Sequence, residues 1–113
     1  MKAVELAPEV YAAGQIFEQD IKIAADHGVR TIINNRPDHE EMGQPLSVDL
    51  ALLATGLGLK FTHIPVVTVP VTEEELADFR EIYEELDKPV LLFCRTGSRS
   101  TALWQTYQTQ DNT

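Results

Sequence analysis

Short apolar runs alternate with amphipathic segments along most of the chain. Four of these runs are bounded by glycine, proline or asparagine, which is typical of strands, and they cover residues 10–13, 29–35, 59–66 and 90–93. Each run is followed by a segment whose apolar residues recur at three- and four-residue spacing, which predicts four helices. The first three helices begin near residues 15, 47 and 72, and the fourth carries Ala102, Leu103, Trp104 and Tyr107.

The alternation of strands and helices predicts the fold class. Strands separated by helices pair in parallel, so we expect an α/β fold of three layers, a mostly parallel sheet of four or five strands with helices on both faces. The uninterrupted apolar run at 90–93 fits a strand that is buried on both sides. Residues 10–13 are expected at an edge of the sheet, because Pro8 interrupts the pattern before them. The whole chain, 1–113, is expected to form one domain.

Local signals set the ends of the predicted helices. Thr72 and Glu75 have the spacing of a capping box, and Ser47 is the expected N-cap of the second helix. His27 and Gly28 are expected to end the first helix, whose apolar side includes Ile16 and Phe17.

The charge balance limits the partners of this protein. Nine basic and eighteen acidic residues give a formal net charge of −9, which disfavours nucleic acid as a partner. No apolar run approaches the length of a membrane span or a signal peptide, so no membrane partner is expected. One cysteine cannot form an internal disulfide, which favours a reducing, cytoplasmic location. The sequence leaves the oligomeric state open.

The stretch from Cys94 to Ser100 combines residue types that bind and attack anions. It follows a buried strand and opens a helix, where free backbone amides and partial positive charge favour an anion or a thiolate. The five residues between its ends are Arg95, Thr96, Gly97, Ser98 and Arg99. We predict Cys94 as the nucleophile, and Arg99 as a planar fork for an oxyanion. The alternative is a small buried cysteine beside solvent-facing arginines, but the density of glycine, hydroxyls and arginines favours the functional interpretation.

A second polar cluster follows the predicted strand at 29–35. Arg36 and Asp38 stand where α/β folds place ligand sites, at the carboxyl end of a strand. Asparagine, aspartate and proline also suit an ordinary turn, and both interpretations stay open, with Arg36 as the expected substrate-binding residue. His63 has no second histidine or cysteine at ligand spacing, so we predict a packed or hydrogen-bonded side chain, and neither a metal nor a cofactor.

The loop at 94–100 resembles both the phosphate loop of cysteine-dependent phosphatases and the active-site loop of single-domain rhodaneses. Three further stretches resemble the phosphatase-like domain family of bacterial beta-lactamase hydrolase-like proteins: Gly14-Gln15, residues 31–38 with Glu40-Glu41 and Gln44-Pro45, and residues 63–66. The resemblance spans nearly the whole chain. It implies a fold similar to dual-specificity phosphatases, with Cys94 as nucleophile and Arg99 as the oxyanion-binding arginine.

Two departures from the phosphatase pattern keep alternatives open. Four residues separate Cys94 from Arg99, whereas phosphatases have five and rhodaneses the shorter spacing. Residues 67–71, where phosphatases carry a general acid, have no ionisable side chain, and Asp38, Glu73 or Glu74 would have to replace it.

Three functions therefore remain. The first, which the resemblance in fold places ahead of the others, is hydrolysis of phosphate monoesters, with Ser100 assisting departure of the Cys94 thiolate and the loop residues from Arg95 to Ser98 binding substrate. The second is sulfur transfer through a Cys94 persulfide. The third is a non-catalytic, anion-binding regulatory domain. A small anionic substrate is expected for both enzymatic functions.

Overall fold

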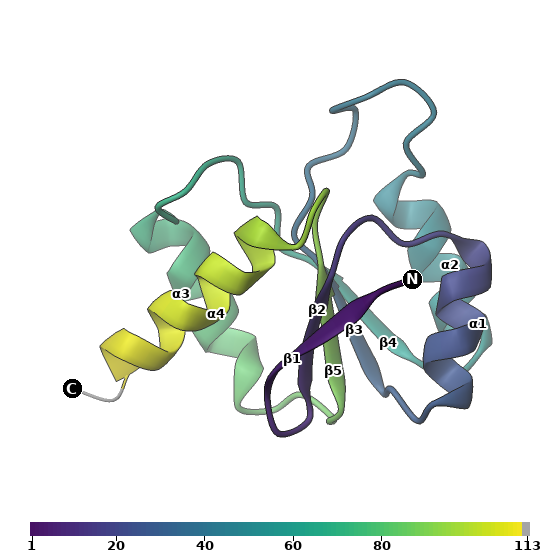
Figure 1. Ribbon diagram of the computed structural model, residues 1–113, viewed down its shortest axis with the longest axis horizontal. Helices are drawn as coiled ribbons and strands as arrows, with labels where there is room; N and C mark the ends of the chain where they lie inside the picture. Colours follow the sequence, from purple (N-terminus) through teal and green to yellow (C-terminus); the bar gives the residue numbers. More distant parts are fainter. Residues whose placement is uncertain (112–113) are drawn as a thin grey trace.

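The computed structural model describes residues 1–111 and contains five strands and four helices (Figure 1). The strands are β1 (Ala3–Ala7), β2 (Val10–Ala13), β3 (Thr31–Asn34), β4 (Lys60–His63) and β5 (Val90–Phe93). The helices are α1 (Glu18–Asp26), α2 (Ser47–Gly56), α3 (Glu73–Tyr83) and α4 (Ser98–Asp111). The strands form one sheet in the order β1-β2-β5-β3-β4, and only the β1–β2 pair is antiparallel. The prediction of a mostly parallel α/β sheet is confirmed.

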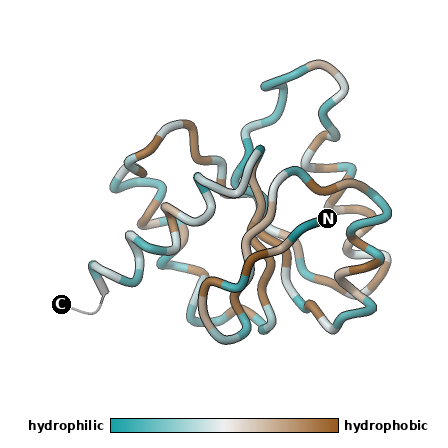
Figure 2. The backbone as a smooth tube through the Cα atoms, viewed as in Figure 1, coloured by the Kyte–Doolittle hydropathy of each residue, from teal (hydrophilic) through white to brown (hydrophobic). Residues whose placement is uncertain are grey.

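The helices cover the two faces of the sheet in pairs. Figure 1 shows α1 and α2 on one side and α3 and α4 on the other, and Figure 2 shows the hydrophobic residues concentrated along the strands between them. Alternate residues of β5 serve the two layers: Val90 and Leu92 pack toward α3 and α4, Leu91 and Phe93 toward α1 and α2. The layer beside α3 and α4 contains a cluster of four aromatic rings in tilted and edge-on contact, those of Phe79, Tyr83, Trp104 and Tyr107.

The N-terminal strands correct one prediction. Val10–Ala13 is not the edge strand, because β1 pairs outside it and forms a hairpin with it. Pro8 interrupts the apolar pattern but does so as part of the tight turn of this hairpin, in which Glu9 takes a left-handed φ of 65°. Most of β1 is exposed, so the alternation that identifies a half-buried strand is weak there.

The predicted helix ends are partly correct. Thr72 caps α3 and Glu75 reaches back to it, as the capping box predicts. The expected N-cap Ser47 is wrong, because Leu46 precedes the helix and Ser47 is its first residue. The first helix begins at Glu18, with Phe17 as its N-cap and 44% exposed, so Phe17 does not belong to its apolar side. Within residues 1–111 no helix is both long and apolar enough to cross a membrane.

Candidate active site

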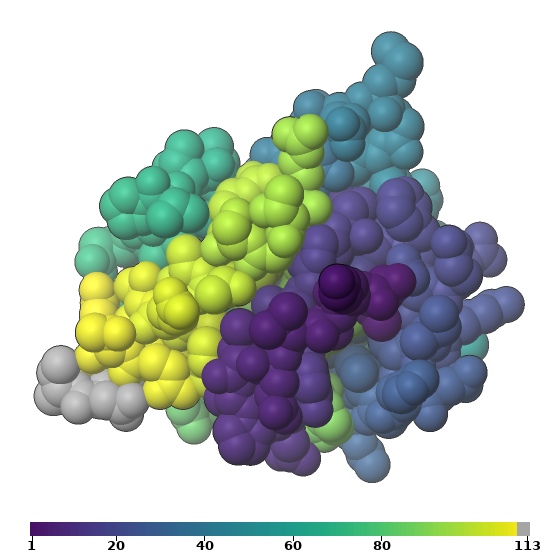
Figure 3. Space-filling model, viewed as in Figure 1, coloured from purple at the N-terminus to yellow at the C-terminus, as the bar shows by residue number. Residues whose placement is uncertain are grey.

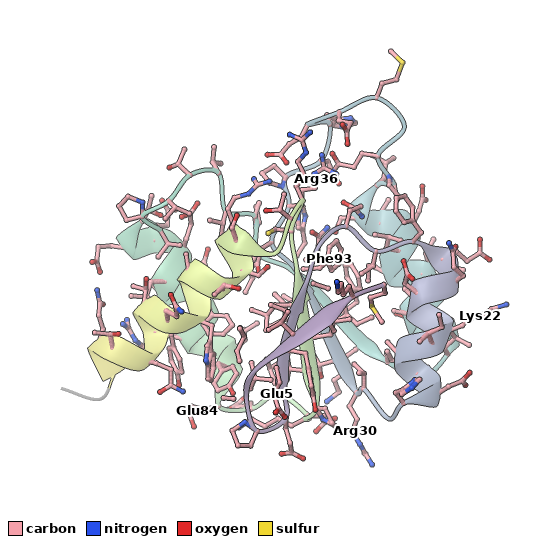
Figure 4. The ribbon with its side chains drawn as sticks, in the orientation of Figure 1. Glu5, Lys22, Arg30, Arg36, Glu84 and Phe93 are labelled. Carbon is pink, nitrogen blue, oxygen red and sulfur yellow. The ribbon has the colours of Figure 1, made fainter. Side chains whose placement is uncertain are left out.

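The carboxyl ends of the parallel strands β5, β3 and β4 bring the predicted site residues to one end of the sheet. Cys94 follows β5, Asn35 and Arg36 follow β3, and His63 ends β4. Adjacent parallel strands in register end side by side, which is why segments far apart in sequence meet there. Figure 4 shows Arg36 at this end of the molecule and Arg30, which precedes the same strand, at the opposite end.

The thiol of Cys94 lies beneath a loop of backbone amides. The residue is completely buried, and the amide of Gly97 donates a hydrogen bond to Sγ at 3.0 Å. Burial raises the pKa of this thiol, but the amides of Ser100, Thr96 and Gly97 and the Ser100 hydroxyl lower it further than burial raises it. The pKa of Cys94 therefore lies below that of an ordinary thiol, which increases the share of nucleophilic thiolate.

Close contact with the turn at residues 13–15 shapes this loop. Gly97 takes a φ of 96°, a conformation that L-residues rarely adopt, and it packs against the backbone of Ala13. A Cβ on Gly14 would approach the carbonyl oxygen of Arg95 to 3.1 Å, and the amide of Gln15 donates to that same oxygen at 3.1 Å. The two glycines thus allow the loop to lie flat on the turn, with its amides directed at the sulfur.

Ser100 is fixed by a buried polar chain. Its hydroxyl donates to Asn35 Oδ1 at 2.8 Å, and Asn35 Nδ2 donates in turn to the carbonyl of Ile64 at 2.9 Å. The same hydroxyl is also within reach of Cys94. Because a hydroxyl has one proton, it can serve either Asn35 or the sulfur, and a negative charge on the sulfur favours the second.

The guanidinium of Arg99 is held by a carboxylate from the loop at 37–46. Its Nη1 and Nη2 each donate to Glu40 at 2.8 Å, and Nη1 also donates to the carbonyl of Val66 at 2.9 Å. The hydrogen bonds from Arg99 and Arg36, stronger together than the opposing effect of burial, lower the pKa of Glu40 to about 2. Glu40 is consequently ionised at neutral pH and occupies the fork predicted to bind an oxyanion.

Three arginines and two glutamates alternate across the mouth of this site. Arg36, which is 1% exposed, donates from Nε to Glu40 at 2.9 Å and from Nη2 to Glu41 at 3.3 Å. Glu41 also lies 3.7 Å from Nη2 of Arg95. Their order across the site is therefore Arg99, Glu40, Arg36, Glu41 and Arg95. The loop that supplies both glutamates stands out from the body of the molecule (Figure 3).

The remaining predicted residues lie at the rim or at a helix end. Thr96 and Ser98 are exposed, and their hydroxyls bond to each other at 2.9 Å rather than to the sulfur. Asp38 accepts a hydrogen bond from the amide of Ser47 at 2.9 Å, so it occupies the start of α2. His63 Nε2 bonds to the carbonyl of Arg36 at 2.8 Å, in agreement with a hydrogen-bonded role. No group of three or more potential metal-binding side chains occurs among the described residues.

Sequence reasoning missed two residues of this arrangement. Asn35 was visible only as one member of a polar turn, and its buried bond to Ser100 depends on a contact across 65 positions. Glu40 stood in a long polar loop, and nothing in its local pattern identifies Arg99 as a partner. The available signal was that an acidic pair, Glu40-Glu41, closely follows an arginine at a strand end.

Comparison with known sequences assigns the family. Residues 3–111 match the family described as "Beta-lactamase hydrolase-like protein, phosphatase-like domain". The chain belongs to this family. Its curated relatives include the beta-lactamase hydrolase-like proteins of Agrobacterium fabrum, 34% identical over 104 residues, and of Xylella fastidiosa strain Temecula1, 31% identical over 104 residues. Each alignment covers 92% of this chain and 24% of the relative, so this chain spans about a quarter of the length of these family members.

Solved structures give the same fold. A candidate phosphatase from Neisseria meningitidis is 31% identical with a TM-score of 0.86, covering 97% of this chain and 78% of that one. A second candidate phosphatase, from Shewanella putrefaciens, is 26% identical with a TM-score of 0.81, covering 97% and 69%. A mutant form of Tk-PTP, 21% identical with a TM-score of 0.76, covers 97% and 72% and shows the shared fold. The protein therefore has a phosphatase-like fold, and these relatives support phosphatase-type chemistry.

Proposed function

We propose that Cys94 is the thiolate nucleophile of a sulfur-transfer reaction, which takes sulfane sulfur from an anionic donor such as thiosulfate and passes it to a thiol. The observation that carries this proposal is the geometry of the carboxylate beside Arg99: Glu40 accepts three hydrogen bonds of 2.8 to 2.9 Å from Arg99 and Arg36. Glu40 is ionised, with a pKa of about 2, and cannot donate a proton to a leaving oxygen near pH 7. Residues 67–71 have no ionisable side chain, and the carboxylate of Asp38 is engaged at the start of α2. Sulfur transfer needs no such acid.

The first half-reaction uses the thiolate and the anion-binding groups. The Cys94 thiolate attacks the outer sulfur of thiosulfate, a new S–S bond forms, the donor S–S bond breaks, and sulfite leaves with the electron pair. Arg99 would leave Glu40 to bind the sulfonate oxygens, and the loop amides would stabilise the charge that remains on the persulfide. No proton is transferred in this step, which leaves Cys94 as an anionic persulfide.

The second half-reaction restores the enzyme. A thiolate acceptor or cyanide attacks the outer sulfur of the persulfide, the Cys94 S–S bond breaks, and the thiolate of Cys94 returns to the amides. The shorter spacing between Cys94 and Arg99 supports this proposal, because a smaller ring offers fewer inward amides for the three oxygens of a phosphoryl group. A reactive Cys94 thiolate favours a reducing compartment such as the cytoplasm.

Hydrolysis of phosphate monoesters is the second candidate, and the family and the structural relatives favour it. In that reaction Cys94 attacks phosphorus, Arg99 and the loop from Arg95 to Ser98 bind the oxygens, and Ser100 assists departure of the thiolate from the phosphocysteine. Because Glu40 is ionised and Asp38 is engaged at the start of α2, we expect it mainly for esters whose leaving group departs as an anion, such as p-nitrophenyl phosphate.

Mass spectrometry tests the proposal directly. After incubation with thiosulfate, we expect one added sulfur atom on wild-type Cys94, none on the Cys94→Ser variant, and loss of the added sulfur on treatment with cyanide. The same preparations are assayed for thiosulfate:cyanide transfer and for p-nitrophenyl phosphate hydrolysis. Phosphate release that depends on Cys94, without any sulfur adduct, would replace sulfur transfer by the phosphatase function. Tight sulfate binding without either activity would favour the non-catalytic regulatory domain.

A further inference from the structure

A second concave site lies beside the loop of Cys94. It encloses about 350 Å³ between the turn at residues 15–17, the loop at 36–45 and the side chain of Arg95. Its lining residues include two arginines, Arg36 and Arg95, and the apolar Phe17, which is 44% exposed. We call it the Arg36–Arg95 pocket. Cationic groups beside apolar walls suit a small organic anion.

The two guanidinium groups share a single, loosely held carboxylate. Glu41 lies 3.3 Å from Nη2 of Arg36 and 3.7 Å from Nη2 of Arg95, whereas charge-assisted hydrogen bonds usually measure about 2.7–2.9 Å. The Glu41 side chain is 52% exposed and that of Arg95 is 63% exposed, so water screens their interaction. Another carboxylate can therefore displace Glu41 from Arg95 at little cost in free energy. At Arg36, which is 1% exposed, it has to replace the 3.3 Å bond to Nη2, while Nε and Nη1 stay bonded to Glu40 and Gln15.

The pocket is continuous with the nucleophile's own loop. One oxygen, Oε1 of Glu40, accepts hydrogen bonds from both Arg36 and Arg99, so the guanidinium that lines the pocket shares a ligand with the guanidinium over the sulfur. Arg95 directly follows Cys94, and its carbonyl is fixed by the amide of Gln15, which also borders the pocket. A molecule seated between Arg36 and Arg95 thus lies beside the mouth of the Cys94 site.

We propose that the Arg36–Arg95 pocket binds the carboxylate of the thiol that accepts sulfur from Cys94, in the place that Glu41 takes in the free protein. The carbon chain of the acceptor lies against Phe17, and its thiolate reaches the outer sulfur of the persulfide. That sulfur then bonds to the acceptor, the Cys94 S–S bond breaks, and its electron pair returns to Cys94. The substrate class is a small thiol that carries a carboxylate. This inference rests on the proposed sulfur transfer.

Two matched acceptors test the pocket. With thiosulfate as donor, kcat/KM is measured for 3-mercaptopropionate, which has a carboxylate, and for 2-mercaptoethanol, which has a hydroxyl instead. The ratio of the two values is compared between wild type and variants, so the intrinsic reactivity of each thiol cancels. We expect Arg95→Gln to lower the ratio about tenfold, the effect of about one charge-assisted hydrogen bond. We expect Glu41→Gln to raise it, because the competing carboxylate is gone.

Arg30→Gln is the control variant. It removes the same charge from the opposite end of the molecule (Figure 4), where the side chain is exposed, so the ratio should equal that of wild type. Circular dichroism and thermal unfolding establish that each variant is folded. If Arg95→Gln leaves the ratio unchanged while thiosulfate still loads Cys94, the pocket assignment alone is overturned. Glu41 would then only hold its own loop in place. Failure of thiosulfate to load wild-type Cys94 overturns both this inference and the sulfur-transfer proposal.

Discussion

Helices α3 and α4 lie side by side on the same face of the sheet, yet their N-termini differ. The first turn of α3 carries Glu73, Glu74 and Glu75, and the hydroxyl of Thr72 accepts from the amide of Glu75 at 3.1 Å. The first turn of α4 contains no acidic residue, and the hydroxyl of Thr96 accepts only a long bond of 3.4 Å from the amide of Ser98. One terminus is satisfied by its own side chains, while the other directs its amides toward the sulfur of Cys94.

This difference shows that the positive potential of a helix N-terminus is available to a ligand at α4, whereas local side chains engage it at α3. Every helix begins with backbone amides that lack intrahelical partners, and a local carboxylate or hydroxyl normally satisfies them. At α3 that local satisfaction stabilises the helix. At α4 the amides of Gly97 and Ser100 instead lower the pKa of Cys94, and they remain available for a negative charge on the sulfur or its substrate.

The largest expected effect comes from giving α4 the acidic first turn of α3. Ser98→Glu places a carboxylate among the amides at the start of α4, where it competes with the thiolate and repels anionic donors. We expect the second-order rate of Cys94 persulfide formation from thiosulfate to fall about fivefold, in line with about 1 kcal/mol for a charge at an exposed helix terminus. Rapid-quench mass spectrometry measures that rate, and Ser98→Gln is the neutral control. Equal rates in Ser98→Glu and Ser98→Gln would contradict the idea that the start of α4 must stay free of acidic residues.

The converse substitution removes the cap of α3. Thr72→Ala deletes the hydroxyl that accepts from Glu75, and we expect it to lower the free energy of unfolding by about 1 kcal/mol. The rate of persulfide formation should stay at the wild-type value, because the start of α3 contributes no amide to the sulfur. Urea unfolding and the persulfide assay check the two halves of this prediction. A large loss of rate would mean that the two helix termini are coupled.

Glu40 supplies a carboxylate to the α4 end from a loop rather than from the helix itself. Its pKa is about 2 in the folded protein and ordinarily 4.5, so its ionised form stabilises the fold above pH 4.5, and this contribution is lost as the pH falls toward 2. We expect Glu40→Gln to be less stable than wild type at pH 7 by up to about 1 kcal/mol, as for partly exposed ion pairs. The gap should close on acidification, which thermal unfolding between pH 7 and pH 2.5 measures.

The smallest effect concerns a single donor to the sulfur. Ser100→Ala removes the hydroxyl within reach of Cys94 but keeps the backbone amides, so the pKa of Cys94 should rise and yet stay below that of an ordinary thiol. The pH dependence of alkylation by iodoacetamide gives this pKa, because only the thiolate reacts. Since a higher pKa leaves less thiolate, the variant should react more slowly at pH 7. A profile identical to that of wild type would assign the stabilisation to the amides alone.

The fold was predictable from the sequence because its signals are local. Apolar runs such as residues 90–93 and the capping box at Thr72 carry their information within a few neighbouring positions, and the predicted parallel sheet followed from their alternation. The first strand was missed because β1 is mostly exposed, so its sequence shows no clear alternation of apolar and polar residues. Its presence decides which strand is at the edge, so one weak local signal changed the predicted place of Val10–Ala13.

The candidate site was predictable only in its contiguous part. The loop from Cys94 to Ser100 stands together in the sequence, and Arg36 was identified by its position after a strand. The partners of these residues were not predictable, because Glu40 is 59 positions from Arg99 and Asn35 is 65 positions from Ser100. Asp38 has the right chemistry for an acid, but it bonds to a helix amide. The path of the long polar loop decides which carboxylate pairs with which arginine, and no local sequence pattern predicts that path.

The place of β5 in the strand order has a further consequence. It is hydrogen-bonded to β2 on one side and to β3 on the other, so its amides should be among the last to exchange with deuterium. The loop at 37–46 has no such ladder and should exchange within the dead time of the experiment at most of its positions. When that loop opens locally, Arg99 would lose Glu40 while the strand that carries Cys94 stays in place, so reagents would meet the opened site in the native state, before any global unfolding.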